Sequence, residues 1–146
     1  SESPLTNLDA RALVNAAVRE MREEASIDLS DAELHLFSHW ITPPTEPRRY
    51  NTHFFLARAT SEHVGSADRF ETHDERWIAP TEALALHAIQ KLRLMYPTIK
   101  HLERIGAFHS VDDIWAFTKT KPIVTIMPGT APEEGFVMPP QLEGIW

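Results

Sequence analysis

The pattern of apolar and polar positions near the start of the chain predicts a helix. Between about residues 9 and 25, apolar side chains recur three or four positions apart, as at Leu13, Ala17 and Met21. Polar residues able to cap a helix precede this run.

Shorter apolar segments further along predict strands. They cover residues 34–41, 50–59 and 75–79, and the loop 43–49 separates the first two. Pro80 then opens a helical region over about 81–119, with Ser110 as a predicted N-cap inside it. The tail 122–146 is β-rich, with predicted strands at 122–128 and 136–139.

This order predicts a mixed α and β protein. No Gly-rich turn follows a strand, which argues against a dinucleotide-binding βαβ fold. A length of 146 residues fits a single domain over 1–146.

Composition narrows the class of partner. A net charge of −7 argues against sequence-blind binding to a nucleic acid polymer. No apolar run is long enough for a membrane span. Cysteine is absent, which excludes disulfides and fits a cytoplasmic protein. The chain starts without methionine, so we expect it to be the later part of something longer or a trimmed chain.

The candidate chemistry lies at the end of the first predicted helix, where Glu20, Glu23 and Glu24 fall on one side. On an ideal helix Glu24 is about 40° from Glu20, and Glu23 is about 60° away on the other side. Such an arc of carboxylates can hold a hard divalent cation. The alternative is an ordinary solvated helix face with charge pairs four residues apart.

The stretch Arg19-Glu20-Met21-Arg22-Glu23-Glu24-Ala25-Ser26-Ile27 resembles the second half of the Nudix box, Arg-Glu-apolar-x-Glu-Glu-x-Gly-apolar. Residues 40–56 resemble a signature of the Nudix branch that contains the peroxisomal coenzyme A diphosphatase, and residues 76–84 resemble the Nudix strand-to-helix junction. The resemblance implies an α+β fold, a Nudix-type α/β/α sandwich with a mixed sheet, truncated at its N-terminal end.

The resemblance also implies a reaction, the hydrolysis of a diphosphate linkage in a nucleoside diphosphate-X or coenzyme A type substrate. Glu20, Glu23 and Glu24 would bind Mg²⁺ or Mn²⁺, and Glu20 is also a candidate base. Arg19 would brace these carboxylates, or form an ordinary surface ion pair.

Other site residues are expected outside the helix. Glu71 is the candidate for a further acidic ligand or base, with Asp74 and Glu75 as alternatives and a solvated acidic turn as the other interpretation. Arg48 and Arg49 are candidates for binding the phosphates or the X group, because guanidinium groups bind phosphate bidentately. A solvated arginine pair is the alternative.

Two departures from the family pattern favour a rival function, a catalytically inactive Nudix-like module that binds a ligand or protein. Ser26 stands where the family has a glycine of positive φ. The first half of the Nudix box would lie upstream of residue 1. The sheet edge left by missing first strands could also pair two copies into a homodimer.

The histidines and the large aromatic residues are interpreted as structural residues rather than as metal ligands or binding residues. The eight histidines form no recognisable metal-ligand spacing and are interpreted as scattered polar or half-buried residues. The larger aromatic residues are expected in the core rather than as stacking platforms; they are Trp40, Phe54, Phe55, Trp77 and Trp115.

Overall fold

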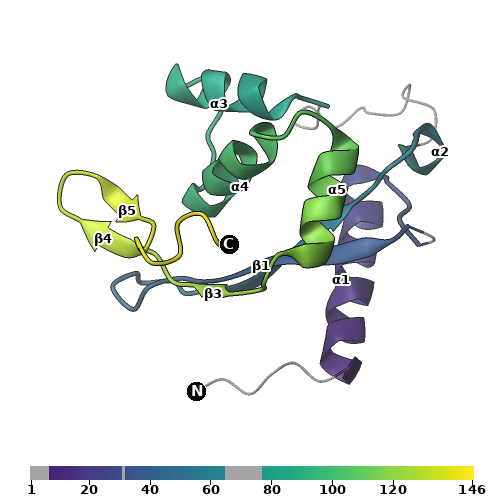
Figure 1. Cartoon of the computed structure of the whole chain (residues 1–146), viewed down its shortest axis with the longest axis horizontal. Coiled ribbons are helices and arrows are strands. Elements are labelled where there is room, and N and C mark those ends of the chain that lie inside the picture. The colour runs from purple at the N-terminus through teal and green to yellow at the C-terminus, as the bar shows by residue number, and fades with distance from the viewer. Residues whose placement is uncertain (1–6, 31, 65–76) are drawn as a thin grey trace. The chain divides into compact units, whose positions relative to one another are not determined.

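The computed structural model describes residues 7–30, 32–64 and 77–146. They form helices and strands in the order α1 (Asn7–Ala25), β1 (Leu34–Ile41), β2 (Asn51–Ala57), α2 (Ser61–Val64), α3 (Pro80–Ala88), α4 (Tyr96–Gly106), α5 (Val111–Thr120), β3 (Thr125–Ile126), β4 (Gly129–Ala131) and β5 (Gly135–Val137), as Figure 1 shows. The fold class is therefore α+β.

The chain forms two compact units. Unit 1 combines Ser1–Phe37 with Phe55–Glu75, and unit 2 combines Ser38–Phe54 with Arg76–Trp146. Both β1 and β2 are thus shared between the units. The prediction of one Nudix-like domain over 1–146 stays a prediction.

The main sheet has three strands in the order β2-β1-β3. β1 pairs in parallel with β3, so that His39 lies opposite Thr125 and Trp40 opposite Ile126. A second, two-stranded sheet is the antiparallel hairpin β4–β5, in which Thr130 faces Phe136. Its tight turn uses Gly135, whose φ of 76° suits a residue without a side chain.

Three helices follow β2 in unit 2. α3 begins with Pro80 at its first position, as predicted. It packs against α4, as Figure 1 shows, where a Cβ on Gly106 would lie only 3.3 Å from the Cβ of Pro80. α5 begins at the predicted N-cap, because the Ser110 hydroxyl accepts a hydrogen bond of 3.1 Å from the Asp113 amide.

The core of unit 2 is built around Trp40, which is 3 % exposed. Its ring meets the rings of Trp146 and Tyr96 edge-on, at centroid distances of 5.5 and 6.2 Å. Such edge-to-face pairs add roughly 0.5–1.5 kcal/mol each beyond the burial of their area. Ile126 on the neighbouring strand is fully buried. In unit 1, the buried apolar side chains are Ile27, Leu29 and Phe37.

Two strand predictions need correction. Residues 77–79 form no strand, and residues 75–76 lie outside the described residues. The backbone of Ala79 is extended, with φ −69° and ψ 144°, because Pro80 disfavours helical geometry in the residue before it. The strand predicted at 122–128 is only Thr125–Ile126, and β4 was not predicted.

Trp77 is also not a core residue. Its side chain is 64 % exposed, whereas Trp40 is buried and Phe54, Phe55 and Trp115 are half-buried. The expectation that these large aromatic residues lie in the core is therefore wrong for Trp77.

Candidate functional site

The last two turns of α1 carry the predicted metal ligands. Glu20, Glu23 and Glu24 are all exposed to solvent. The Nε of Arg19 lies 4.0 Å from a carboxylate oxygen of Glu23, one helical turn further on. Both side chains are about two-thirds exposed, so this ion pair contributes at most ~1 kcal/mol. Its geometry fits either a bracing role or an ordinary surface pair.

Ser26 ends this helix in a left-handed conformation. Its φ is 55°, a value that costs residues with a side chain roughly 1 kcal/mol. The following amide, of Ile27, donates a hydrogen bond of 3.1 Å to the carbonyl of Met21, which closes the helix end. Serine thus adopts the backbone geometry that the sequence resemblance assigns to glycine at this position.

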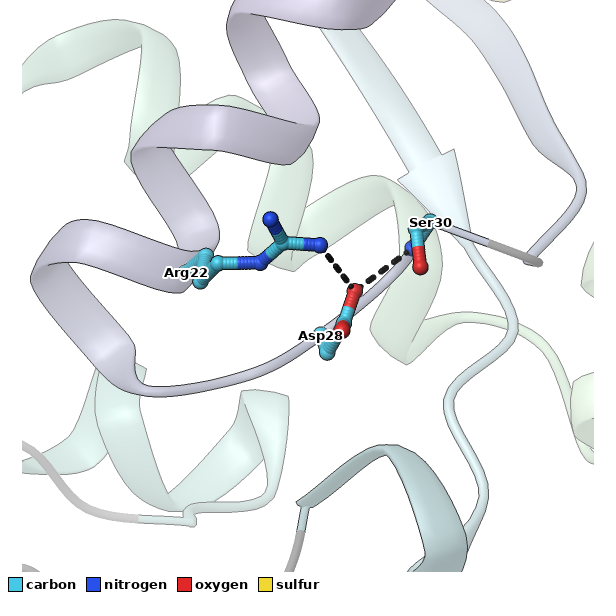
Figure 2. Close-up of polar contacts among 3 residues, drawn as sticks. All are labelled: Arg22, Asp28 and Ser30. Carbon is cyan, nitrogen blue, oxygen red and sulfur yellow. Dashed lines mark hydrogen bonds and ion pairs between the residues drawn. The ribbon is translucent and has the colours of Figure 1, made fainter.

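A polar contact fixes the chain just after the helix (Figure 2). The Arg22 guanidinium donates to Asp28 Oδ1 at 2.8 Å, and the Ser30 amide donates to the same oxygen at 3.0 Å. These hydrogen bonds, the one from Arg22 first, hold the pKa of Asp28 well below its usual range. On either side of Asp28, Ile27 and Leu29 are buried. The helix end that carries the glutamates is therefore anchored by both polar and apolar contacts.

The donor chemistry of the three glutamates fits Mg²⁺ or Mn²⁺. These ions prefer carboxylate oxygens and usually complete their shell with water and substrate phosphates. Within the described residues, no three His, Asp or Glu side chains are grouped closely enough to hold a metal by themselves. Glu71, the predicted extra acidic residue, and its alternatives Asp74 and Glu75 lie outside the described residues.

Unit 2 contains a cavity of about 660 Å³, within the usual range for small-molecule sites. Its walls come from β1 and the loop and strand after it, from residues 95–98 at the start of α4, and from Pro128 and Phe136. Arg48 lines it, and so does Glu46. Among the predicted site residues that the structure describes, Arg48 lines this cavity, and Glu20, Glu23, Glu24 and Arg49 do not.

Arg49 has a different setting from Arg48. Its Nε donates a hydrogen bond of 3.1 Å to the carbonyl oxygen of Thr42, across the neck of the loop. The Tyr50 amide donates to Thr42 Oγ1, and the Thr42 amide donates to the Tyr50 carbonyl, both at 3.0 Å. The loop is thus closed by its own hydrogen bonds, and Arg49 helps to hold Arg48 in place.

A buried polar chain behind the cavity wall was not predicted. Trp40 Nε1 donates to Ser38 Oγ at 3.0 Å, and Ser38 Oγ donates to His101 Nε2 at 2.6 Å. His101 Nδ1 donates to the Pro97 carbonyl at 2.6 Å, which fixes the neutral tautomer. Burial lowers the pKa of His101 to about 4. Because Ser38 is fully buried, this chain positions the cavity wall and offers no accessible nucleophile.

The sequence carried a partial signal for the cavity. Phe54 was interpreted as core, yet it lines the cavity together with Tyr50, whose side chain is 61 % exposed. The contributions of Tyr96 and Phe136 depend on tertiary contacts between distant segments.

The acidic end of α1 and the left-handed Ser26 after it belong to the stretch whose sequence resembles the second half of the Nudix box. Among characterised proteins the chain is similar to the acyl-coenzyme A diphosphatase NUDT19 of Xenopus laevis, with 28 % identity over 85 residues. The match covers 56 % of this chain and 22 % of that protein. No family model matches the chain, and no solved structure matches it. The similarity supports relationship to the Nudix superfamily.

A separate observation concerns membranes. Across residues 7–30, 32–64 and 77–146, no helix combines the length and the apolar character that a bilayer crossing requires.

Proposed function

We propose that the protein to which this chain belongs hydrolyses a diphosphate linkage with the help of Mg²⁺ or Mn²⁺. The observation that carries this proposal is the end of α1, where three exposed glutamates precede a left-handed residue. The similarity to an acyl-coenzyme A diphosphatase supports a substrate of the coenzyme A type.

Each residue has a proposed role in this reaction. Glu20, Glu23 and Glu24 bind the divalent ion, and Glu20 is also the candidate base that accepts a proton from the attacking water. A bound ion would neutralise the diphosphate and lower the pKa of water. Arg48 contacts the phosphates or the X group, while Arg49 holds the loop through Thr42. Glu71 is proposed as a further acidic residue.

The test is release of phosphate-containing products from coenzyme A, ADP-ribose and NADH with Mg²⁺, using the full-length protein. We expect turnover of at least one substrate, and a loss of on the order of 10²-fold or more in Glu23→Gln and in Glu24→Gln. Glu82→Gln serves as the control, because Glu82 is an exposed glutamate of α3. Equal activity in all three variants would show that Glu23 and Glu24 take no part in the reaction.

A binding module without catalysis is the second candidate. The formed cavity in unit 2 favours it, because a cavity can hold a ligand without the chemistry of α1. Absence of turnover across the panel, together with measurable binding of one of its members, would support this function instead.

A further inference from the structure

The turn that joins α3 to α4, residues 89–95, combines exposed apolar side chains with positive charge (Figure 1). Ile89 caps the end of α3 and is 61 % exposed, and Met95 caps the start of α4 and is 66 % exposed. Between them, Lys91 and Arg93 are also exposed. Two apolar side chains therefore flank two cations at the surface of unit 2.

Hydrogen bonds fix the backbone of this α3–α4 turn. Gln90 has a left-handed φ of 59°. Its amide donates to the His87 carbonyl, and the Lys91 amide donates to the Leu86 carbonyl, both at 2.9 Å. This pair of bonds is a common way to end a helix on a left-handed residue. Because the turn is already ordered, binding through it would cost little further backbone entropy.

The charge of the α3–α4 turn is opposite to that of the whole chain. Residues 83–102 contain no Asp or Glu, although the chain has a net charge of −7. Of the carboxylates that the structure describes, none forms an ion pair with Lys91 or Arg93, whereas Lys100 is paired with Glu103. Salt screens charges beyond about 8 Å at physiological ionic strength, so the two local cations dominate near the turn.

This combination of side chains fits the surface of an anionic lipid bilayer. Anionic headgroups attract Lys and Arg, and apolar side chains gain free energy when they enter the boundary between headgroups and acyl chains. An acidic polypeptide would pair with Lys91 and Arg93 but would give Ile89 and Met95 no apolar partner. The exposed apolar residues therefore favour a lipid surface over an acidic protein.

We propose that the α3–α4 turn binds the surface of a membrane that contains anionic phospholipids. Lys91 and Arg93 meet the phosphate groups, and Ile89 and Met95 enter the headgroup region. The contact is peripheral and requires no segment that spans the bilayer. It is independent of the proposed hydrolysis, because none of these four residues has a role assigned in that reaction.

The first experiment is flotation of the full-length protein with vesicles of phosphatidylcholine, with and without phosphatidylserine. We expect binding to the vesicles that contain phosphatidylserine, and much weaker binding to the neutral ones. Added salt should weaken the binding, because it screens the attraction between the cations and the headgroups. Absence of binding to the anionic vesicles, or equal binding to both kinds, would overturn the proposal.

Two lysines provide a matched pair of charge variants. Lys91→Gln removes a cation from the turn, while Lys119→Gln removes an exposed cation from α5 and changes the net charge by the same amount. The first variant should bind anionic vesicles about fivefold more weakly, and the second should bind them as the unchanged protein does. Equal affinities of the two variants would contradict the assignment of the surface.

Two β-branched residues test the apolar part of the contact. Ile89 is 61 % exposed and Val111, the first residue of α5, is 57 % exposed. Ile89→Ser should weaken vesicle binding about threefold or more, whereas Val111→Ser should leave it unchanged. Circular dichroism confirms that both variants are folded. The same affinity in both would show that Ile89 does not enter the membrane.

Polyglutamate distinguishes a lipid surface from an acidic polypeptide. If the protein binds polyglutamate through Lys91 and does not bind anionic vesicles, its partner is an acidic polypeptide and the membrane proposal is wrong. Glu23→Gln should bind anionic vesicles as tightly as the unchanged protein. Failure of the proposed hydrolysis would therefore leave this result unaffected.

Discussion

At the scale of single residues, the contact between Arg22 and Asp28 makes a prediction about pH. The lowered pKa of the Asp28 carboxyl means that its contact contributes to stability above about pH 3.9, the ordinary pKa of aspartate, and is lost as the pH falls through the folded value. Arg22→Gln should raise the pKa of Asp28 toward that ordinary value, as followed by NMR titration of its side-chain carbon. Arg11→Gln, at an exposed arginine of the same helix, should leave it unchanged.

A second residue-scale prediction concerns His101, whose pKa burial lowers from 6.5 to about 4. Between these values the unfolded chain binds more protons at this side chain than the folded chain. The free energy of unfolding should therefore fall as the pH drops from 6.5 to 4, by up to roughly 3 kcal/mol. Urea titrations across this range measure it.

The variant His101→Phe separates this effect from other titrations. It should lower stability at every pH, because Ser38 Oγ loses its acceptor, and it should also flatten the slope between pH 6.5 and 4. A slope as steep as before would show that other groups cause it. His109→Phe, at an exposed histidine, should leave the NMR titration of His101 unchanged.

Sequence patterns identified residues whose partners are local. The Ser110 cap and the Arg19–Glu23 pair each join positions three or four apart, and helical geometry alone brings such residues together. The contact from Ser38 to His101 joins residues 63 positions apart, and nothing in either local pattern indicates it.

At the scale of elements, the end of α1 yields a stability prediction. Because Ser26 has a φ of 55°, Ser26→Gly should stabilise the protein by about 1 kcal/mol. Ala25→Gly, one position earlier in the helix, should destabilise it by about 0.5–1 kcal/mol instead. Denaturant unfolding of both variants checks the pair. Destabilisation by Ser26→Gly would mean that contacts of the serine side chain outweigh the backbone cost.

Elements with a strong periodic pattern were predictable, whereas short ones were not. β1 covers Leu34–Ile41, the predicted residues, because its apolar run is long and ends at prolines. β3 has two residues and β4 has three, so pairing with a partner rather than local sequence defines them. The backbone at Ala79 is extended because a proline follows it, although residues 77–79 form no strand.

At the scale of the whole molecule, the proposed metal site predicts a linkage between ion binding and stability. Mg²⁺ at 100 times its dissociation constant should raise the free energy of unfolding by about 2.7 kcal/mol. Glu24→Gln should remove most of this gain, while Glu82→Gln should retain it. Thermal unfolding with and without Mg²⁺ measures the difference. An equal response in both variants would place the ion elsewhere.

The order in which the two units use the chain has a consequence for synthesis on the ribosome. The polypeptide passes from unit 1 to unit 2 after Phe37, returns after Phe54, and leaves again after Glu75. Unit 1 therefore cannot be completed until residue 75 has emerged from the ribosome. The segment Ser38–Phe54 can complete unit 2 only after residues 76–146 have emerged as well. Domains made of one continuous segment can fold in turn as they appear. Here the ring of Trp40 lacks its final neighbours until Tyr96 and Trp146 have been synthesised, and the ring of Phe54 lacks that of His101.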